Sequence, residues 1–176
     1  MANPALLMRR LLNLLYDGAA AAAAFFMVAL LCMVLLSIAS RQFNFHVPGT
    51  DAYAGYLMAA SGFLALAHTL KRGEHIRVTL LLGMLRGRWK KGFELWALGL
   101  ATLLALLYAF YSCKLAWQSH AFQDISTGSD ATPLWLPQLA MAFGTSVLAI
   151  AFVDELVLEL LGRRQERPAG EALRNE

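Results

Sequence analysis

The stretch GAAAAAAFFMVALLCMVLLSIAS, residues 18–40, decides how this chain folds, because 23 consecutive residues carry no charged side chain. A helix of that length rises about 35 Å, which exceeds the roughly 30 Å hydrocarbon core of a bilayer. Backbone inside hydrocarbon must satisfy its own hydrogen bonds, and a helix does so. The stretch therefore predicts a transmembrane helix.

Three more apolar blocks follow the first one, at residues 52–70, 93–113 and 134–158. Each is long enough to cross the hydrocarbon core as a helix. The sequence therefore predicts an all-α integral membrane protein with four transmembrane helices. Its membrane domain is expected at residues 18–161, between an N-terminal arm at 1–17 and a disordered tail at 162–176.

The overall composition agrees with this prediction and excludes a soluble enzyme. Of the 176 residues, 59% are hydrophobic and 15% are charged, whereas an ordinary soluble domain has about 25% charged residues. The net charge is +3, and the basic residues cluster beside the apolar blocks. Anionic membrane lipid therefore explains the basic residues, and nucleic acid is not expected as a partner.

The first apolar block also has to be compared with a cleavable signal peptide. Arg9 and Arg10 precede the block, and Ser37-Ile38-Ala39 resembles a cleavage site. The apolar region of a signal peptide has about 7–15 residues, however, and this one is much longer. The sequence favours a retained helix.

The Lys and Arg residues of the short connections set the orientation, because basic loops stay on the cytoplasmic side. Thirteen of them fall in the N-terminal arm, in the connection at residues 71–91 and in the tail. The other two, Arg41 and Lys114, fall on the opposite side. Both termini of this multi-pass membrane protein are therefore predicted to be cytoplasmic.

The basic connection encloses a short apolar run, LLLGML at residues 80–85. So short a run cannot cross a bilayer, and the apolar side chains of this connection spread nearly all round a helical wheel. We therefore expect a short helix at residues 74–88 that lies in the inner membrane interface, held there by its two basic ends.

On the outer side, Arg41 and Asp51 stand at adjacent ends of the first two spans. They are expected either to pair across the hairpin or to act as two separate interfacial charges. In the outer connection before the fourth span, Pro133 and Pro137 bracket Trp135, which suits the first turn of a helix. This connection either contacts a periplasmic partner or forms a plain solvated loop.

Polar residues inside the spans are few, and no span has a charged residue near its centre. The mid-span hydroxyls are expected to bond their own backbone or a neighbouring helix; they belong to Ser61, Thr102, Thr145 and Ser146. A carrier needs a polar cavity at mid-membrane. Four such helices therefore make a poor transporter alone.

Carboxylates close the fourth span at Asp154, Glu155 and Glu159, with Arg163 one turn further on. A carboxylate inside a bilayer would suggest an ion pathway, but these lie at the end of the span. We expect interfacial salt bridges instead, including an i,i+4 pair of Glu159 with Arg163.

The spans are rich in small residues at helical spacing. Ala97, Ala101 and Ala105 form such a stripe on the third span. Small residues let helices approach closely, which drives their association in lipid. The stripe serves packing within the chain or against a partner equally well.

No cofactor or metal site is expected in this chain. Cys32 and Cys113 lie in or at the end of apolar spans without metal-ligand spacing, where a thiol acts as a small hydrophobe. A haem anchor needs two histidines that face each other at similar depth, and the other spans offer none opposite His68. The membrane anchor of a redox complex remains the alternative hypothesis, and a self-sufficient small exporter is a third.

Three stretches of the chain resemble a known family: DAYAGYL at residues 51–57, GFLALA at 62–67 and KRGEHIRV at 71–78. Arg41 and the Pro133/Pro137 pair fit the same pattern. Over about residues 10–160, the chain resembles the small membrane subunit of tripartite ATP-independent periplasmic (TRAP) transporters, the DctQ-like family.

This resemblance implies a division of labour among three proteins. A periplasmic binding protein captures an organic acid such as a dicarboxylate or sialic acid, and a large multi-span permease subunit holds the substrate and sodium sites and moves as an elevator. The small subunit, which is not an enzyme, braces the scaffold of the large one. The candidate structural or interface residues are Arg41, Asp51, Arg72, Gly73, His75, Ile76, Ala97, Ala101, Ala105, Pro133, Trp135 and Pro137.

Overall fold

The computed structural model describes residues 4–45, 47–72 and 88–162. Within these ranges it contains four helices: α1 (Pro4–Gln42), α2 (Thr50–Arg72), α4 (Arg88–Ala121) and α5 (Trp135–Leu160). The described residues include no β-strand, only an isolated bridge between Ile125 and Pro133. The predicted all-α architecture is therefore confirmed. The interfacial helix expected at 74–88 lies outside the described residues, except for Arg88, where α4 begins.

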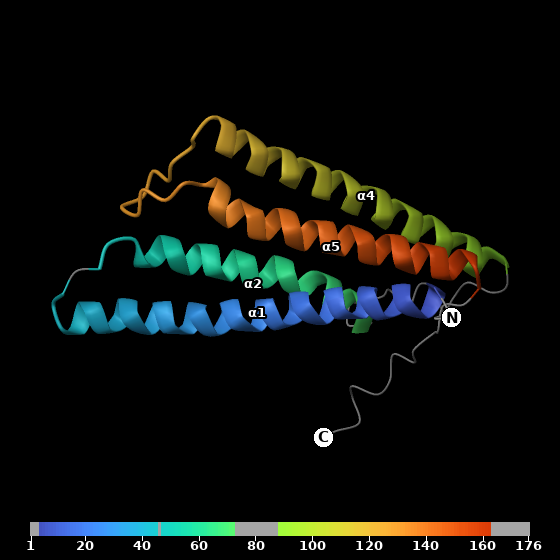
Figure 1. The fold of residues 1–176 in the computed structure, drawn as a ribbon, viewed down its shortest axis with the longest axis horizontal. Coiled ribbons are helices and arrows are strands. Elements are labelled where there is room, and N and C mark those ends of the chain that lie inside the picture. The colour runs from blue at the N-terminus through green and yellow to red at the C-terminus, as the bar shows by residue number, and fades with distance from the viewer. Residues whose placement is uncertain (1–3, 46, 73–87, 163–176) are drawn as a thin grey trace, which may run out of the picture.

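The helices lie side by side in the order α1, α2, α5, α4 (Figure 1). Helices that follow one another in the chain run in opposite directions, so the loops 43–49 and 122–134 lie at the same end of the row. The row neighbours α2 and α5 therefore run in the same direction. The two central helices, α2 and α5, pack against a neighbour on each side. The chain thus places α5 beside α2, from which it is distant in sequence.

Three of the four described helices are long and apolar enough to cross a membrane, namely α1, α4 and α5. Helix α2 has 23 residues, about 35 Å at 1.5 Å per residue, so it matches the bilayer in length but is less apolar. Its position between α1 and α5 shields much of its surface. A fourth crossing and cytoplasmic termini stay predictions.

The edge helices of the row are longer than a crossing requires. Helix α1 has 39 residues and α4 has 34, whereas about 20 suffice for hydrocarbon. The helix containing the first span starts at Pro4 rather than at residue 18, and the helix of the third span covers 88–121 rather than 93–113. Both carry large exposed apolar side chains along most of their length, as a lipid-facing or partner-facing surface requires.

The core is built from small side chains rather than large ones. Buried alanines lie on all four helices: Ala19, Ala23, Ala60, Ala67, Ala105, Ala116, Ala142, Ala149 and Ala151. Lipid tails are as apolar as the side chains of a helix, so burying a side chain between helices gains no hydrophobic free energy. Transmembrane helices therefore associate through close contact between small residues. Most large apolar side chains lie on the outside, although Tyr16, Leu64, Leu98 and Leu148 are buried.

Helices α5 and α2 approach each other closely at Gly144 of α5. A Cβ atom at this position would lie 2.5 Å from the carbonyl oxygen of Phe63 on α2. Backbone packs on backbone here, which only a residue without a side chain permits. Gly144 therefore fixes how α5 crosses α2.

The buried face of α4 does not follow the predicted alanine stripe. Ala97 is exposed, Ala101 is half-buried and Ala105 is buried. Residues four apart are rotated by about 40° relative to each other around a helix with 3.6 residues per turn. A row of residues spaced strictly by four therefore turns away from the neighbouring helix. The contact instead alternates steps of four and three, as packed helices do, and its buried members are Leu98, Thr102, Ala105, Ser112, Ala116 and Ser119.

Candidate functional site

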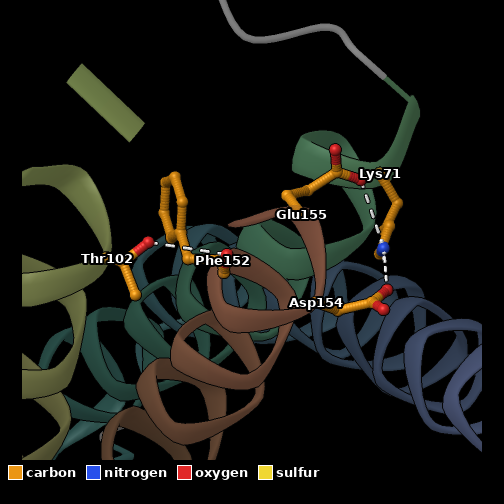
Figure 2. A network of polar contacts seen from close by, with 5 residues as sticks. All are labelled: Lys71, Thr102, Phe152, Asp154 and Glu155. Atoms are coloured by element: carbon orange, nitrogen blue, oxygen red, sulfur yellow. Dashed lines mark hydrogen bonds and ion pairs between the residues drawn. The ribbon is translucent and has the colours of Figure 1, made fainter. Parts of the chain in front are cut away.

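Three charged side chains meet at the end of the row where α2 and α5 finish, which we call the inner end because it is the one predicted to be cytoplasmic. Lys71 points from the last turn of α2 to Asp154 and Glu155 on α5 (Figure 2). Its Nζ donates hydrogen bonds to Asp154 Oδ2 and, at 3.2 Å, to Glu155 Oε1. The three side chains are only 20%, 16% and 15% exposed. We call these residues the inner ion cluster.

Helix α1 also contacts the inner ion cluster, through Tyr16. The Nζ of Lys71 lies 5.2 Å from the ring centre of Tyr16, within range of a cation–π contact. Tyr16 is 3% exposed and belongs to an apolar cluster with Ala19, Val147 and Ala151. The inner ion cluster thus ties α1, α2 and α5 together at one level.

The structure confirms salt bridging at this end of α5, and Lys71 of α2 is the partner of Asp154 and Glu155. Lys71 lies 83 positions before Asp154 in the sequence. The pair of Glu159 with Arg163 lies outside the described residues, because Arg163 does. A cluster in which one lysine contacts two carboxylates joins α2 to α5, as a structural salt bridge does.

Most mid-span hydroxyls serve their own helix, as predicted. Thr102 donates to Leu98 O at 2.7 Å and lies 3.5 Å from Phe152 O on α5 (Figure 2). The hydroxyls of Thr145 and Ser146 donate to Met141 O and Ala142 O. Groups engaged in this way are not available to a solute.

At the outer end of the row, the loop 122–134 is fastened to α2. Tyr56 Oη donates to Asp130 Oδ2 at 3.0 Å, and Ser126 Oγ donates to Asp130 Oδ1 at 2.8 Å. Thr132 Oγ1 donates to Tyr53 Oη at 3.1 Å. We call these five residues, Tyr53, Tyr56, Ser126, Asp130 and Thr132, the outer clamp.

The loop 43–49 comes close to the outer clamp at Gly49. This glycine has φ +80°, which side-chain-bearing residues rarely adopt, and a Cβ there would lie 2.7 Å from Asp130 Cβ. The two outer loops therefore touch. A hollow of about 530 Å³ beside them is lined by loop residues such as Asn44 and Ser129 and by Arg41 and Asp51 at the adjoining ends of α1 and α2.

Asp130 is expected to hold the outer clamp only while it is ionised. Desolvation raises its pKa, but hydrogen bonds from Ser126, Thr132 and Tyr56 outweigh that effect and lower the pKa to about 2, from the usual 3.8. Because the folded-state pKa is depressed, this contribution is complete above about pH 4 and is lost as the pH falls towards 2.

Pepsin cleavage of loop 122–134 at pH 5 to 2 tests this expectation. We expect the wild-type loop to become as susceptible as that of Asp130→Asn by about pH 2, while being better protected at pH 5. Asp124→Asn, in the same loop, should behave like wild type. A wild-type to Asp130→Asn ratio that does not change with pH would contradict the assignment.

Of the two alternatives for Arg41 and Asp51, the structure shows the ion pair across the first hairpin. Arg41 Nη2 lies 3.6 Å from Asp51 Oδ2, and the side chains are 74% and 81% exposed. Ser37 Oγ lies 3.5 Å from the other carboxylate oxygen, Oδ1. An ion pair so open to water contributes little to stability, so its two charges stay available at the outer surface.

The other candidate residues are dispersed over the fold. Gly73, His75 and Ile76 lie outside the described residues, and Arg72 ends α2. At the outer end, Trp135 begins α5, and its ring packs edge-on against His120 at 5.3 Å. Pro137 falls in the first turn of α5 and Pro133 lies just before it, as predicted for that helix start. The structure therefore brings Arg41 and Asp51 together but gathers no polar site around the other candidates that it describes.

The described residues contain no group of three or more His, Cys, Asp or Glu side chains that could hold a metal ion. His68, the candidate weighed for haem, lines a groove between α1 and α2, and its Nδ1 is 3.8 Å from Asp17 Oδ1. The described residues provide packed helices, two sets of polar contacts (the inner ion cluster and the outer clamp) and an apolar exterior.

Comparison with known protein families gives this architecture a context. Residues 30–162 match the family described as tripartite ATP-independent periplasmic transporters, DctQ component. The chain belongs to this family. It is therefore a small permease component of a TRAP transporter, and the DctQ resemblance of its sequence is confirmed. A search of curated proteins found no match.

Membership of the DctQ family agrees with the small number of polar residues in the spans. A DctQ component is part of a transporter with other proteins, so the polar cavity of a carrier need not lie within it. The family also points to a transport component rather than to the anchor of a redox complex. Three helices apolar enough to span a membrane agree with a multi-pass membrane protein.

Proposed function

We infer that this DctQ protein is the non-catalytic small subunit of a sodium-driven TRAP transporter for organic acids in a bacterial inner membrane. It braces the stationary scaffold of a large permease subunit, which carries the substrate and sodium sites and moves as an elevator. A periplasmic binding protein delivers the acid. The choice of acid rests with these other proteins.

One observation supports the bracing role: noncovalent contacts join distant parts of the described chain on the inside, and its outside is apolar. Close contacts at Gly144, the inner ion cluster and the outer clamp join helices that are distant in sequence. On the exterior, α1 and α4 present long apolar faces. A brace needs this combination, because it must keep its shape while offering surface to a partner and to lipid.

Transport measurements on a reconstituted system test this function. Proteoliposomes with both membrane subunits, given the binding protein, an organic acid and an inward sodium gradient, should accumulate the acid. Vesicles that lack the small subunit should show only the uptake of empty vesicles, since an unbraced scaffold cannot support the movement of the carrier. Uptake that continues without this chain would refute the bracing role.

A second measurement separates the bracing role from a direct role in transport. This chain reconstituted alone should give no solute flux and no Soret band, as expected of a subunit without its own solute or haem site. Flux from this chain alone would support a self-sufficient exporter, and a Soret band would support a haem anchor.

A further inference from the structure

A groove of about 300 Å³ lies between α1 and α2. Small side chains line most of it: Ala20, Ala23 and Ala24 on α1, and Ala65 on α2. Helices that present small residues let another backbone approach closely, which is the main source of helix association in lipid. The groove is therefore shaped for a close neighbour.

Ser61 indicates that the groove binds a partner with a hydrogen-bonding group. It lines the groove, is 3% exposed and has no hydrogen-bond partner among the described residues. Thr102, Thr145 and Ser146 all donate to a carbonyl of their own helix, which Ser61 does not. Ser112 is also unpaired, but its Oγ is completely shielded between packed helices, so nothing outside the chain can reach it.

The depth of Ser61 limits which partner can satisfy it. Asp51 and Lys71 lie ten residues before and after it on α2, so each charged end is about 15 Å away along the helix axis. That places Ser61 near the middle of a hydrocarbon core of about 30 Å. A lipid tail has no hydrogen-bonding group at this depth, whereas a transmembrane helix brings backbone carbonyls and hydroxyls.

The inner mouth of the groove adds an electrostatic requirement. Asp17 lies there, 3.8 Å from His68, and its carboxylate is 72% exposed. Transmembrane helices carry Lys and Arg at their cytoplasmic ends, so a helix in this groove would bring a positive charge to Asp17. The headgroup of an anionic lipid would be repelled by the same carboxylate.

We propose that the groove between α1 and α2 is the docking site for a transmembrane helix of the large permease subunit. The partner helix packs on the alanines, accepts a hydrogen bond from Ser61 and places its basic inner end near Asp17. This proposal rests on the proposed function, because it names the surface through which the bracing acts.

Co-purification of the large subunit with the tagged small subunit tests the docking site. Ala24→Leu and Ala65→Leu fill the groove and should lower recovery of the large subunit about tenfold, the effect of 1–2 kcal/mol of lost helix contact. Ala21→Leu is the matched control, because Ala21 is exposed on α1 and does not line the groove. Its recovery should equal that of wild type.

A photo-crosslinking amino acid gives a second reading that does not require a destabilising change. Placed at position 24, it should link to the large subunit in the assembled complex; placed at the exposed position of Leu103 on α4, it should not. Native mass spectrometry of the same samples shows whether a lipid is bound.

The outcomes separate the docking site from the proposed function. If the wild-type small subunit does not recover the large subunit, the proposed function fails and the docking site with it. If wild type recovers it and the two leucine variants do so equally, without a crosslink from position 24, the docking site is wrong and the function stands. Loss of a bound phospholipid from the leucine variants, with the large subunit retained, would show that the groove holds lipid and overturn the proposal.

Discussion

Replacing Gly144 with alanine is expected to push α5 away from α2. The added Cβ would lie 2.5 Å from the carbonyl oxygen of Phe63 and 2.6 Å from its carbonyl carbon. These are backbone atoms inside a helix, so they cannot rotate aside as a flexible side chain would. Overpacking of this kind costs about 1–3 kcal/mol and occasionally more, and Gly144→Leu should cost more than Gly144→Ala.

Unfolding of the purified protein in mixed micelles with increasing SDS, followed by circular dichroism, measures the effect of Gly144→Ala. Gly62→Ala is the matched control, because Gly62 is a helical glycine of α2 whose added Cβ meets nothing within 4 Å. The control should keep its stability or gain up to about 1 kcal/mol, since alanine favours helix over glycine. A wild-type unfolding curve for Gly144→Ala would rule out the tight crossing.

The positions of the four described helices along the chain could be predicted from the sequence, but their ends could not. Hydropathy detects the part of a helix that crosses hydrocarbon, and it placed the first crossing from residue 18. The helix itself starts at Pro4 and includes Arg9, Arg10 and Asp17, because a helix continues into the interface where charged side chains are solvated. Helix α4 extends beyond its apolar block at both ends for the same reason.

The contacts between helices were the least predictable part of the fold. Small-residue positions can be recognised in a sequence, but which neighbour they meet depends on the order of helices in the row. Because α5 lies beside α2, Asp154 meets Lys71 rather than a basic residue of its own tail, and Gly144 meets Phe63.

The outer clamp shows the same limit. Tyr56 and Asp130 are 74 residues apart, and neither residue type at its position signals a contact with the other. By contrast, Arg41 and Asp51 face each other across one short hairpin, so their pairing could be expected from the sequence. Short-range pairs follow from local geometry, whereas long-range pairs require the packing order.

Replacing Lys71 with methionine is expected to be the most damaging change at the inner end of the protein. Asp154 and Glu155 would lose the ammonium group that both contact, while they remain only 16% and 15% exposed. Removing one partner of a fully buried ion pair costs about 3–5 kcal/mol, and for these partly buried carboxylates the cost should be at or below that range. Lys71 also covers the ring of Tyr16, so its loss loosens α1 as well.

The same SDS unfolding experiment measures the effect of Lys71→Met. Lys114→Met is the matched control, because Lys114 is an exposed lysine of α4 and an exposed charge contributes about 1 kcal/mol at most. If the inner ion cluster holds the helices together, the control should unfold like wild type and Lys71→Met well before it. Equal curves for the two variants would contradict that role.

A combined variant distinguishes the charge balance of the inner ion cluster from the shape of the lysine side chain. Lys71→Met together with Asp154→Asn and Glu155→Gln removes all three charges, and replacing a whole buried ion cluster by neutral residues is often neutral or stabilising. The triple variant should therefore recover most of the stability that Lys71→Met loses. If it does not, the aliphatic stem and the contact with Tyr16 matter more than the ion pairs. If it does, the carboxylates are tolerated at the end of α5 because Lys71 compensates them, and their part in the transporter is to fix α5 against α2.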